Sequence, residues 1–224
     1  RMYKIIKRAI DILASMLAII LILPFILPII FILTITGEGE IFYFQKRVGK
    51  NGKTINIFKF ATMLKNSEST GTGIYTAKND DRILPFGNFL RKTKINEIPQ
   101  IFNIFLGDIS IVGPRPLIKE TFNFYSKEGK KMITSVKPGL TGIGSIVFRN
   151  EDELLSKTNM NIEDFYRNNI SPAKEELEMW YIKNKSTILD LKIIFVTAWI
   201  IFFRDENLPW KVFKGLPQNN LFTN

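Results

Sequence analysis

The sequence contains neither cysteine nor histidine among its 224 residues. Without cysteine, disulfides and thiolate metal sites are excluded. Without histidine, Ser-His and Cys-His nucleophilic systems, histidine general bases and HExxH zinc sites are excluded as well. Any catalysis must therefore use carboxylates, Lys, Arg, Tyr, Ser or Thr, or a metal ion held by oxygen ligands.

Acidic residues are scarce relative to basic ones, with 21 Asp and Glu against 31 Lys and Arg and a formal net charge of +10. Such an excess favours polyanionic partners: nucleic acid, phosphorylated metabolites or anionic lipid headgroups. Cations and carboxylates without histidine suit phosphate chemistry assisted by Mg²⁺. The length allows one sizeable domain, or one domain plus a membrane segment.

The N-terminal segment carries the longest apolar run, residues 10–37, in which only Ser15 and Thr34 are polar between Ile12 and Ile35. It is long enough to span a bilayer. A secretory signal peptide is an alternative, but the run is longer than an h-region and no A-x-A-like cleavage site follows it. The run therefore indicates a membrane segment.

Two features of this run favour a re-entrant helix over a simple span. Pro24 and Pro28 lie mid-run, and each removes a backbone hydrogen bond and bends the helix. Cations flank both ends, so the positive-inside tendency predicts that both ends stay cytoplasmic; they are Arg1, Lys4, Lys7, Arg8, Lys46, Arg47, Lys50 and Lys53. Prolines also occur in ordinary spans, so composition leaves both topologies open. Asp11 lies at helical contact spacing from Lys7 and Arg8, which predicts an ion pair near the interface.

After this segment, residues 41–63 are expected to form two strands around Asn51-Gly52, a strong hairpin signal. Residues 64–80 are polar and rich in Ser, Thr, Gly and Lys, which predicts a mobile surface loop. From Phe86 to Phe105 the apolar residues follow helical spacing.

Pro99 is expected early in a helix, with Asn96 as its N-cap and Glu97 in the first turn, where the helix dipole favours an acid. Glu97 is the only carboxylate between Arg91 and Asp108. A capping role is thus one explanation for the Asn-Glu pair.

Arg115 is held between Pro114 and Pro116, after a short predicted strand. Two prolines fix the backbone on either side, and a rigidly presented guanidinium suits phosphate or carboxylate binding. A turn with a solvated arginine is the alternative. Residues 116–135 predict a surface helix, and residues 137–142 form a turn-rich element with cations and backbone donors.

The C-terminal third is polar with helical patches over residues 150–185 and then apolar over residues 187–203. The apolar run contains Asp190 and Lys192 and is too short to span, which predicts an interfacial or core helix. The aromatic and basic residues Trp199, Trp210, Phe213, Lys211 and Lys214 are compatible with a headgroup-level edge or with a core.

Taken in order, five motifs resemble the monotopic bacterial phosphoglycosyl transferases, also called bacterial sugar transferases. They are the Lys7-Arg8…Asp11 start of the proline-broken helix, the segment 57–63 with Ala61 where the family's KFRTM element usually has Arg, the segment 81–93, the segment from Gly107-Asp108 to Gly113-Pro114-Arg115-Pro116, and the segment 137–142. The resemblance covers nearly the whole chain.

The resemblance implies a function. Members of this family move a phospho-sugar from a UDP-sugar to a polyprenyl phosphate at the cytoplasmic face of the bacterial inner membrane, releasing UMP and starting glycan assembly. They use Mg²⁺ and an Asp-Glu dyad, in which the Asp attacks the β-phosphate and the Glu binds the metal, while the Pro-Arg-Pro motif helps hold the nucleotide.

The chain departs from the family at the dyad, which here is Asn96-Glu97. An amide has no ionised oxygen with which to form an acyl phosphate. In one interpretation this is a natural subgroup, in which Glu97 takes over as nucleophile or base, or the two substrates react directly around Mg²⁺. In a second, a transferase has lost its nucleophile and retains binding. In a third, the chain is a catalytically inactive membrane-bound homologue that acts as a scaffold or partner of glycan-assembly enzymes.

A second departure follows Gly142, where the family usually continues with an Ala-Gln-type strand and this chain continues with residues 143–153. Arg149 and the acids after it can serve the sugar or a relocated metal ligand, or they belong to a solvated loop. Two coordinated departures favour the subgroup interpretation. The apolar N-terminus and the lack of an aromatic-basic RNA signature argue against a nucleic-acid-binding protein.

The resulting hypothesis is an α/β monotopic membrane enzyme with a proline-kinked re-entrant helix over residues 1–36 and a small mixed cytosolic catalytic domain with membrane-surface amphipathic helices over residues 37–224. The expected partners are a UDP-sugar, polyprenyl (undecaprenyl) phosphate, membrane lipids and Mg²⁺, with no nucleic acid; a homodimer is compatible with the sequence. The resemblance assigns Glu97 to Mg²⁺ or to the phosphate, and Asn96 to the first dyad position. Arg115, with Pro114 and Pro116, is expected to contact the nucleotide. Lys59, counted among the catalytic residues, is expected to neutralise pyrophosphate charge together with Arg82 and Arg91, and Arg149 is expected to bind the substrate. Asp108 is a weaker candidate, because an Asp after Gly is often only part of a turn.

Overall fold

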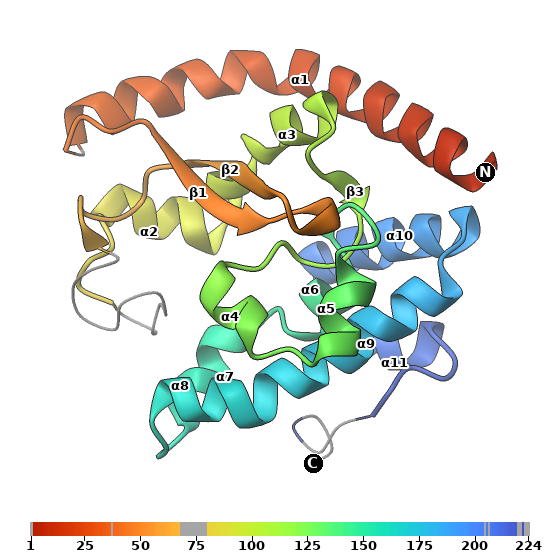
Figure 1. Ribbon diagram of the computed structural model, residues 1–224. Helices are drawn as coiled ribbons and strands as arrows, with labels where there is room; N and C mark the ends of the chain where they lie inside the picture. Colours follow the sequence, from red (N-terminus) through yellow and green to blue (C-terminus); the bar gives the residue numbers. More distant parts are fainter. Residues whose placement is uncertain are drawn as a thin grey trace.

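The computed structural model describes residues 2–36, 38–67, 80–203, 205, 207–218 and 221. In this part of the chain, helices surround two small two-stranded sheets. One long helix, α1 (Met2–Thr36), lies across one side of the remaining elements (Figure 1). The mixed helix and sheet architecture with a long apolar N-terminal helix confirms the coarse fold prediction.

Helix α1 is continuous through Pro24 and Pro28 and is curved in Figure 1. In the described chain it is the one helix long and apolar enough to cross a membrane by length and composition. Most of its apolar side chains are exposed, and its buried residues are Asp11, Ser15, Ile26 and Leu33. Most of its apolar surface is therefore not buried in the protein core.

Polar residues of α1 anchor its first turns to the domain. Asp11 is buried and accepts hydrogen bonds from Ser110 Oγ (2.8 Å) and from the Ile111 backbone N–H (2.9 Å). Arg8 donates to two backbone carbonyls of α3 (Gln100–Leu106), and Lys7 pairs with Asp190 at 2.7 Å. The expected ion pair between Asp11 and Lys7 or Arg8 is therefore wrong, because each of these groups finds a tertiary partner instead.

The hairpin expected over residues 41–63 is confirmed. Strands β1 (Phe42–Val48) and β2 (Thr54–Phe60) pair antiparallel, with Phe44 opposite Phe58. The turn η1 (Lys50–Gly52) places Asn51 and Gly52 at φ 58° and 74°, the left-handed region that Asn and Gly tolerate best. Most of the predicted loop over residues 64–80 lies outside the described residues.

The segment from Phe86 to Phe105 is helical as its spacing predicted, but it breaks in the middle. It forms α2 (Pro85–Lys92), a short 3-10 helix η3 (Ile95–Glu97) and α3 (Gln100–Leu106). Lys94 has φ 60°, so the chain turns sharply before η3. Asn96 caps no helix: the residue before α3 is Pro99, and no side chain caps its start.

The short strand predicted before the Pro-Arg-Pro turn is present and belongs to a parallel pair. Strand β3 (Ser110–Val112) pairs with β4 (Gly139–Thr141), Ser110 lying opposite Gly139. The surface helix expected over residues 116–135 is instead two helices, α4 (Lys119–Asn123) and α5 (Lys127–Ile133). The second starts anew because Ser126 Oγ accepts from the Gly129 N–H and caps it.

The C-terminal third is helical and carries the largest core cluster. Its elements are α6 (Ile143–Val147), α7 (Glu151–Lys157), α8 (Ile162–Phe165), a π-helical turn η4 (Tyr166–Ile170), α9 (Ser171–Asn184), α10 (Thr187–Phe203) and α11 (Leu208–Val212). The cluster includes the fully buried Ile143, Ile170 and Ile193.

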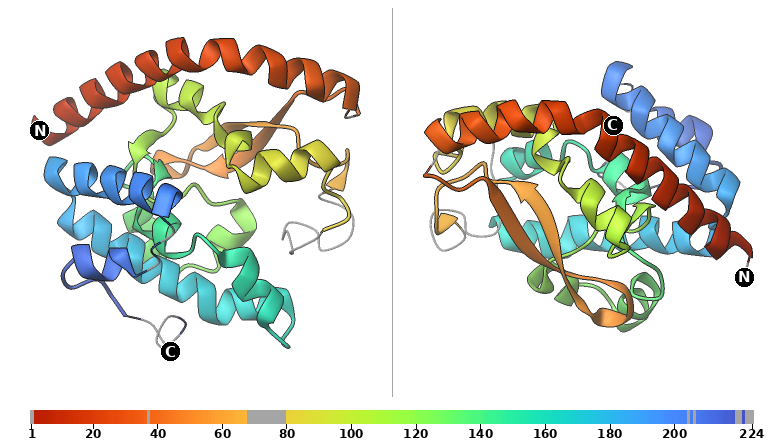
Figure 2. Two further views of the ribbon diagram at one scale, coloured as in Figure 1. Left: turned by 180° about the vertical axis from the view of Figure 1, so that it is seen from behind. Right: turned by 90° about the horizontal axis from the view of Figure 1, so that it is seen from above.

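Helix α10 fits the expectation of a core helix on one face only. Ile193 and Val196 are buried, whereas Ile188, Phe195 and Phe202 are exposed. It runs close to the N-terminal half of α1 (Figure 2). Two helices with exposed apolar faces thus lie near each other.

Candidate functional site

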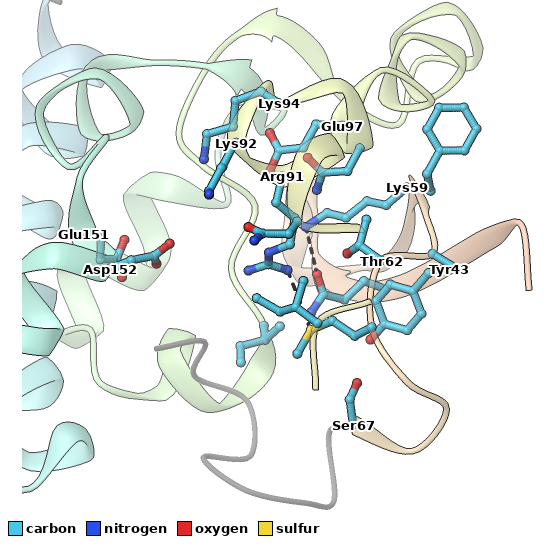
Figure 3. A pocket seen from close by; sticks show the side chains of 18 of the residues that line it. Tyr43, Lys59, Thr62, Ser67, Arg91, Lys92, Lys94, Glu97, Glu151 and Asp152 are labelled. Atoms are coloured by element: carbon cyan, nitrogen blue, oxygen red, sulfur yellow. Dashed lines mark hydrogen bonds between the residues drawn. The ribbon is translucent and has the colours of Figure 1, made fainter. Parts of the chain in front are cut away.

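A cavity of about 1400 Å³ opens between the β1–β2 hairpin, the α2–η3 segment, the Pro-Arg-Pro turn and residues 149–155. Pockets for a single small ligand are typically about 300–1,000 Å³. This one is larger, and two substrates can share it. Figure 3 shows part of its lining.

The cavity has a basic lining, with nine Lys or Arg residues against five acids. The fold collects there six of the sequence-predicted site residues: Lys59, Arg91, Asn96, Glu97, Arg115 and Arg149. They come from four separate stretches of the chain. The positive electrostatic potential of this lining favours an anionic ligand.

Glu97, in η3, lies within 3.4 Å of Arg115, measured from its Oε1 to the arginine Nη2. Burial opposes its ionisation, but the charges of Arg115, Lys59 and Lys94 outweigh that effect and lower the pKa of Glu97 to about 2. The carboxylate is therefore ionised at neutral pH. It is available as a metal ligand or as a nucleophile, but not as a general acid.

The Pro-Arg-Pro turn is fixed through its backbone. The Pro114 carbonyl accepts from the Gly139 N–H at 2.8 Å, and the Pro116 carbonyl accepts from Arg47 Nη1 at 3.0 Å. Both prolines are buried and lie outside the cavity lining, while Arg115 lies in it. The prolines thus hold the backbone, and the arginine faces the ligand space. Glu97, the largest influence, raises the pKa of Arg115 despite burial.

Lys59, on β2, projects into the cavity near Glu97 and Arg91 (Figure 3). Burial lowers its pKa to about 7, although Glu97 acts to raise it. Its Nζ donates to Gln45 Oε1 at 3.3 Å. Burial also lowers the pKa of Arg91. Contact with an anionic ligand would stabilise the charged forms of these desolvated cations.

Asn96 is buried, and its side-chain Oδ1 has no hydrogen-bond partner among the described residues. A buried acceptor left unpaired costs about 1–3 kcal/mol, so the site is arranged for a donor or a cation that a ligand brings. Neutral amide and carboxylate oxygens are suitable ligands for Mg²⁺. The oxygens of Glu97 and Asn96 are therefore chemically compatible with such an ion.

The protein donor set for a metal is small. The described stretches contain no group of three or more Asp or Glu placed to hold a metal ion. Mg²⁺ commonly binds through one or two protein oxygens together with substrate phosphates and waters. A site of two protein oxygens agrees with that pattern.

Arg82 does not join the site, contrary to the prediction. Its guanidinium pairs with Asp80, at 2.5 Å, and donates to the Ser67 carbonyl. The side chain is buried and does not line the cavity. Asp80, two residues earlier, engages the guanidinium through both carboxylate oxygens, which draws it away from the ligand space.

Asp108 also lies outside the cavity lining and accepts from Asn103 Nδ2 at 3.2 Å. This contact agrees with the local turn role considered for it.

Sequence reasoning missed several basic residues that line the cavity, among them Arg47 and Lys174. Arg47 lines it while holding the Pro116 carbonyl. Lys174 is buried beside it and donates to Glu151 Oε2 at 2.5 Å and to the Tyr166 hydroxyl at 3.2 Å. Their local sequences are typical of an ordinary strand and an ordinary helix. On this side of the cavity, the sequence indicated a site only through the acids that follow Arg149. Glu151 and Asp152 lie across the cavity from Lys59 and Glu97 (Figure 3).

Together, the exposed apolar helix and the cation-rich cavity that contains the ionised Glu97 carboxylate define a membrane-associated α/β protein whose cavity suits anionic ligands. The chain belongs to the bacterial sugar transferase family, whose model matches residues 2–204.

Several characterised relatives support this assignment. The chain is 36% identical over 197 residues to the UDP-glucose:undecaprenyl-phosphate glucose-1-phosphate transferase of Klebsiella pneumoniae, covering 86% of this chain and 39% of the relative. It is 34% identical over 198 residues to the UDP-N-acetylgalactosamine-undecaprenyl-phosphate N-acetylgalactosaminephosphotransferase of Aeromonas hydrophila, with 87% and 43% covered.

The third relative is of more similar length. The exopolysaccharide production protein ExoY of Sinorhizobium fredii is 30% identical over 205 residues, 85% of this chain and 83% of the relative. The chain thus spans about two fifths of the length of the first two relatives and most of the third.

Proposed function

We propose that the chain is a phosphoglycosyl transferase that moves a phospho-sugar from a UDP-sugar to a polyprenyl phosphate, releasing UMP and starting bacterial glycan assembly. The observation that carries this proposal is the ionised Glu97 paired with Arg115 in a cation-rich cavity of a membrane-associated family member. The names of two relatives, which specify UDP-sugars and undecaprenyl phosphate, supply the substrate classes.

In this reaction the bond between the β-phosphorus and the oxygen that links it to UMP breaks, and UMP leaves with the electron pair. A new bond forms from the β-phosphorus to an oxygen of the polyprenyl phosphate. Charge accumulates on the phosphoryl oxygens, so fixed cations supply much of the catalysis. Arg115, Lys59, Arg91 and Arg149 all line the cavity, which supports this role for them.

Mg²⁺ is the proposed cofactor, with Glu97 and Asn96 as its protein ligands. When bound, it supplies Lewis-acid neutralisation of the pyrophosphate. The orphaned Asn96 Oδ1 supports this assignment. Arg115 then has two tasks: it binds phosphate oxygens, and it holds the Glu97 carboxylate in place.

The dyad position decides the route. Asn96 cannot form an acyl phosphate, so we assign the chain to a divergent branch in which Glu97 either attacks the β-phosphorus or leaves the two substrates to react directly. A second candidate function, a catalytically inactive scaffold or partner of glycan-assembly enzymes, is favoured by the same amide. It retains the cavity without turnover.

The exposed apolar faces of α1 and α10 support a membrane placement. We infer that residues 1–36 form a re-entrant helix bent at Pro24 and Pro28, that residues 37–224 form the catalytic domain on the cytoplasmic face of the inner membrane, and that α10 lies at the interface. A prenyl chain then reaches the cavity from the membrane side.

The test is direct. Purified protein in nanodiscs with Mg²⁺, undecaprenyl phosphate and a panel of UDP-sugars is expected to release UMP and form the lipid-linked product. Glu97→Gln should lower the rate by at least about a hundredfold, because it removes the ionised carboxylate. Absence of UMP with every sugar, together with retained UDP-sugar binding, would favour the scaffold.

Intact-mass spectrometry of the protein, quenched after mixing with the UDP-sugar alone, separates the two routes. A phospho-sugar adduct that disappears in Glu97→Gln identifies the carboxylate as nucleophile. Turnover without an adduct identifies direct transfer. Activity gained only in Asn96→Asp would show that the first dyad position has lost its nucleophile.

A further inference from the structure

A buried carboxyl group lies directly behind the Pro-Arg-Pro turn. Glu178, on α9, is 3% exposed. Its Oε1 accepts a hydrogen bond from the Arg115 backbone N–H at 3.2 Å. Arg115 therefore contacts two acids. Its guanidinium pairs with Glu97 in the cavity, and its backbone N–H donates to Glu178 on the opposite side of the turn.

This hydrogen bond has no substitute within the turn. Pro114 and Pro116 have no N–H, so Arg115 carries the one backbone donor of the Pro-Arg-Pro tripeptide. The carbonyls of the two prolines are held by Gly139 and Arg47. Glu178 supplies the remaining attachment, at the main-chain N–H of Arg115 itself.

The surroundings of Glu178 are shaped around its carboxyl. At Gly144 a Cβ atom would clash with Glu178 Oε1, so the glycine makes the space that this oxygen occupies. The other oxygen, Oε2, has no hydrogen-bond partner among the described residues. A carboxyl buried with one oxygen unsatisfied is unfavourable for folding alone. Its placement points to a purpose beyond packing.

We propose that Glu178 is a positioning residue for the transferase reaction, fixing the Arg115 main chain so that the guanidinium meets Glu97 and the phosphates of the nucleotide sugar. It acts through Arg115 and touches no substrate, since it does not line the cavity. The kinetic test of this inference rests on the proposed function, whereas the positioning role itself rests on the geometry of the turn.

The test is a double-mutant cycle on kcat/KM for UMP release, in which Glu178→Leu removes the acceptor and Arg115→Ala removes the guanidinium. Glu178→Leu is expected to lower kcat/KM by about tenfold, the cost of one buried hydrogen bond. Arg115→Ala should lower it by about a hundredfold in the native background but by only about tenfold after Glu178→Leu, because coupled groups are not additive. Additive losses would overturn the proposal.

Conservative and control variants separate positioning from packing. Glu178→Gln keeps a carbonyl acceptor and should retain most of the activity, whereas an equal loss in Glu178→Gln and Glu178→Leu would contradict the proposal. Glu176, exposed on the same helix, provides the control: Glu176→Leu should leave both kcat/KM and the Arg115→Ala effect unchanged. If Glu178→Leu does not fold, Glu178→Met, closer in shape, takes its place in the cycle.

Failure of the proposed function is distinguishable from failure of this inference. If the native protein releases no UMP, the same cycle is measured as the affinity for UDP by calorimetry, where Arg115 still contributes. Non-additive binding losses would then support the positioning role without turnover, and additive ones would overturn it.

Discussion

Asn96 and Glu97 are adjacent in sequence yet face different electrostatic conditions. Glu97 keeps its charge because Arg115, Lys59 and Lys94 outweigh the effect of its burial. Asn96 carries no charge and leaves its Oδ1 without a partner in the described structure. At the scale of single residues, the Asn96-Glu97 pair gives the cavity one anion held by cations beside one neutral acceptor without a partner among the described residues.

The pKa of Lys59, near 7, predicts the alkaline limb of the pH profile. Its positive charge is present below pH 7 and is lost as the pH rises through this value. If the charged form binds phosphate, kcat/KM should fall about tenfold per pH unit above 7. Glu97, with a pKa of about 2, contributes no limb in the neutral range.

The measurement is the pH dependence of UMP release for the native protein and for Lys59→Arg. Arginine stays charged throughout, so the variant should move the alkaline limb to higher pH. An unchanged limb in Lys59→Arg would assign it to another group.

Glu178 predicts a pH-dependent stability. Burial raises its pKa from 4.5 to about 7, so the folded state holds a proton that the unfolded state has released between these values. The free energy of unfolding therefore falls as the pH rises through this window. Glu178→Gln lacks this loss, and its stability relative to the native protein should increase by up to about 3 kcal/mol between pH 4.5 and pH 8, at 1.36 kcal/mol per unit.

Thermal unfolding in detergent at several pH values measures this difference. The same comparison with Glu176→Gln serves as the control, because that side chain is exposed. A constant offset between Glu178→Gln and the native protein across the window would contradict the assignment.

At the scale of elements, α1 is attached to the catalytic elements by polar groups. Asp11 holds Ser110 and Ile111 of β3, the strand that leads into the Pro-Arg-Pro turn. Nearer the N-terminus, Asp190 of α10 accepts from Lys7 at 2.7 Å and from Tyr181 of α9 at 2.8 Å. Polar contacts thus join α1 to the strand before the Pro-Arg-Pro turn and, separately, to α10.

Asp11→Ala should loosen β3. The substitution leaves the Ser110 hydroxyl and the Ile111 amide without their acceptor, which is expected to destabilise the protein by about 1–3 kcal/mol. Hydrogen exchange at the Ile111 amide should become faster, and UMP release should fall because the turn after β3 shifts. Asp11→Asn, which keeps one acceptor oxygen, is the matched control and should show a smaller change in both measurements.

At the scale of the whole molecule, apolar surface is concentrated on α1 and α10, near each other in the views of Figures 1 and 2. The basic cavity lies in the domain that these helices border. For the proposed transferase, this arrangement would bring an aqueous nucleotide sugar and a membrane-held acceptor to the same cavity.

The absence of cysteine makes the membrane topology testable. Lys4→Cys marks the start of α1, and Lys53→Cys marks the exposed hairpin turn. If α1 is re-entrant, both single cysteines should react with an impermeant maleimide in inverted membrane vesicles and neither in intact spheroplasts. Labelling of Lys4→Cys and Lys53→Cys from opposite sides would show instead that α1 spans the bilayer.

Local signals predicted several parts of the fold because each depends on near neighbours. Asn51-Gly52 specified its hairpin through left-handed turn geometry, and the run from Ile12 to Ile35 specified a long apolar helix. The helices expected over residues 86–105 and 116–135 were each interrupted. Lys94 adopts a left-handed conformation that interrupts the helix. The spacing of apolar residues continues unchanged across it, so periodicity does not reveal the break.

The sequence by itself determined the available chemistry. Without histidine or cysteine, phosphate binding had to rely on cations, carboxylates and amide oxygens, and a rigid Arg115 followed from its two prolines. The tertiary structure decided which of these groups meet: it brought Lys59, Glu97 and Arg115 to one cavity, withdrew Arg82 into its pair with Asp80, and placed Glu178 behind the turn. The physical reason is that charge and burial act through space, between residues that no local pattern connects.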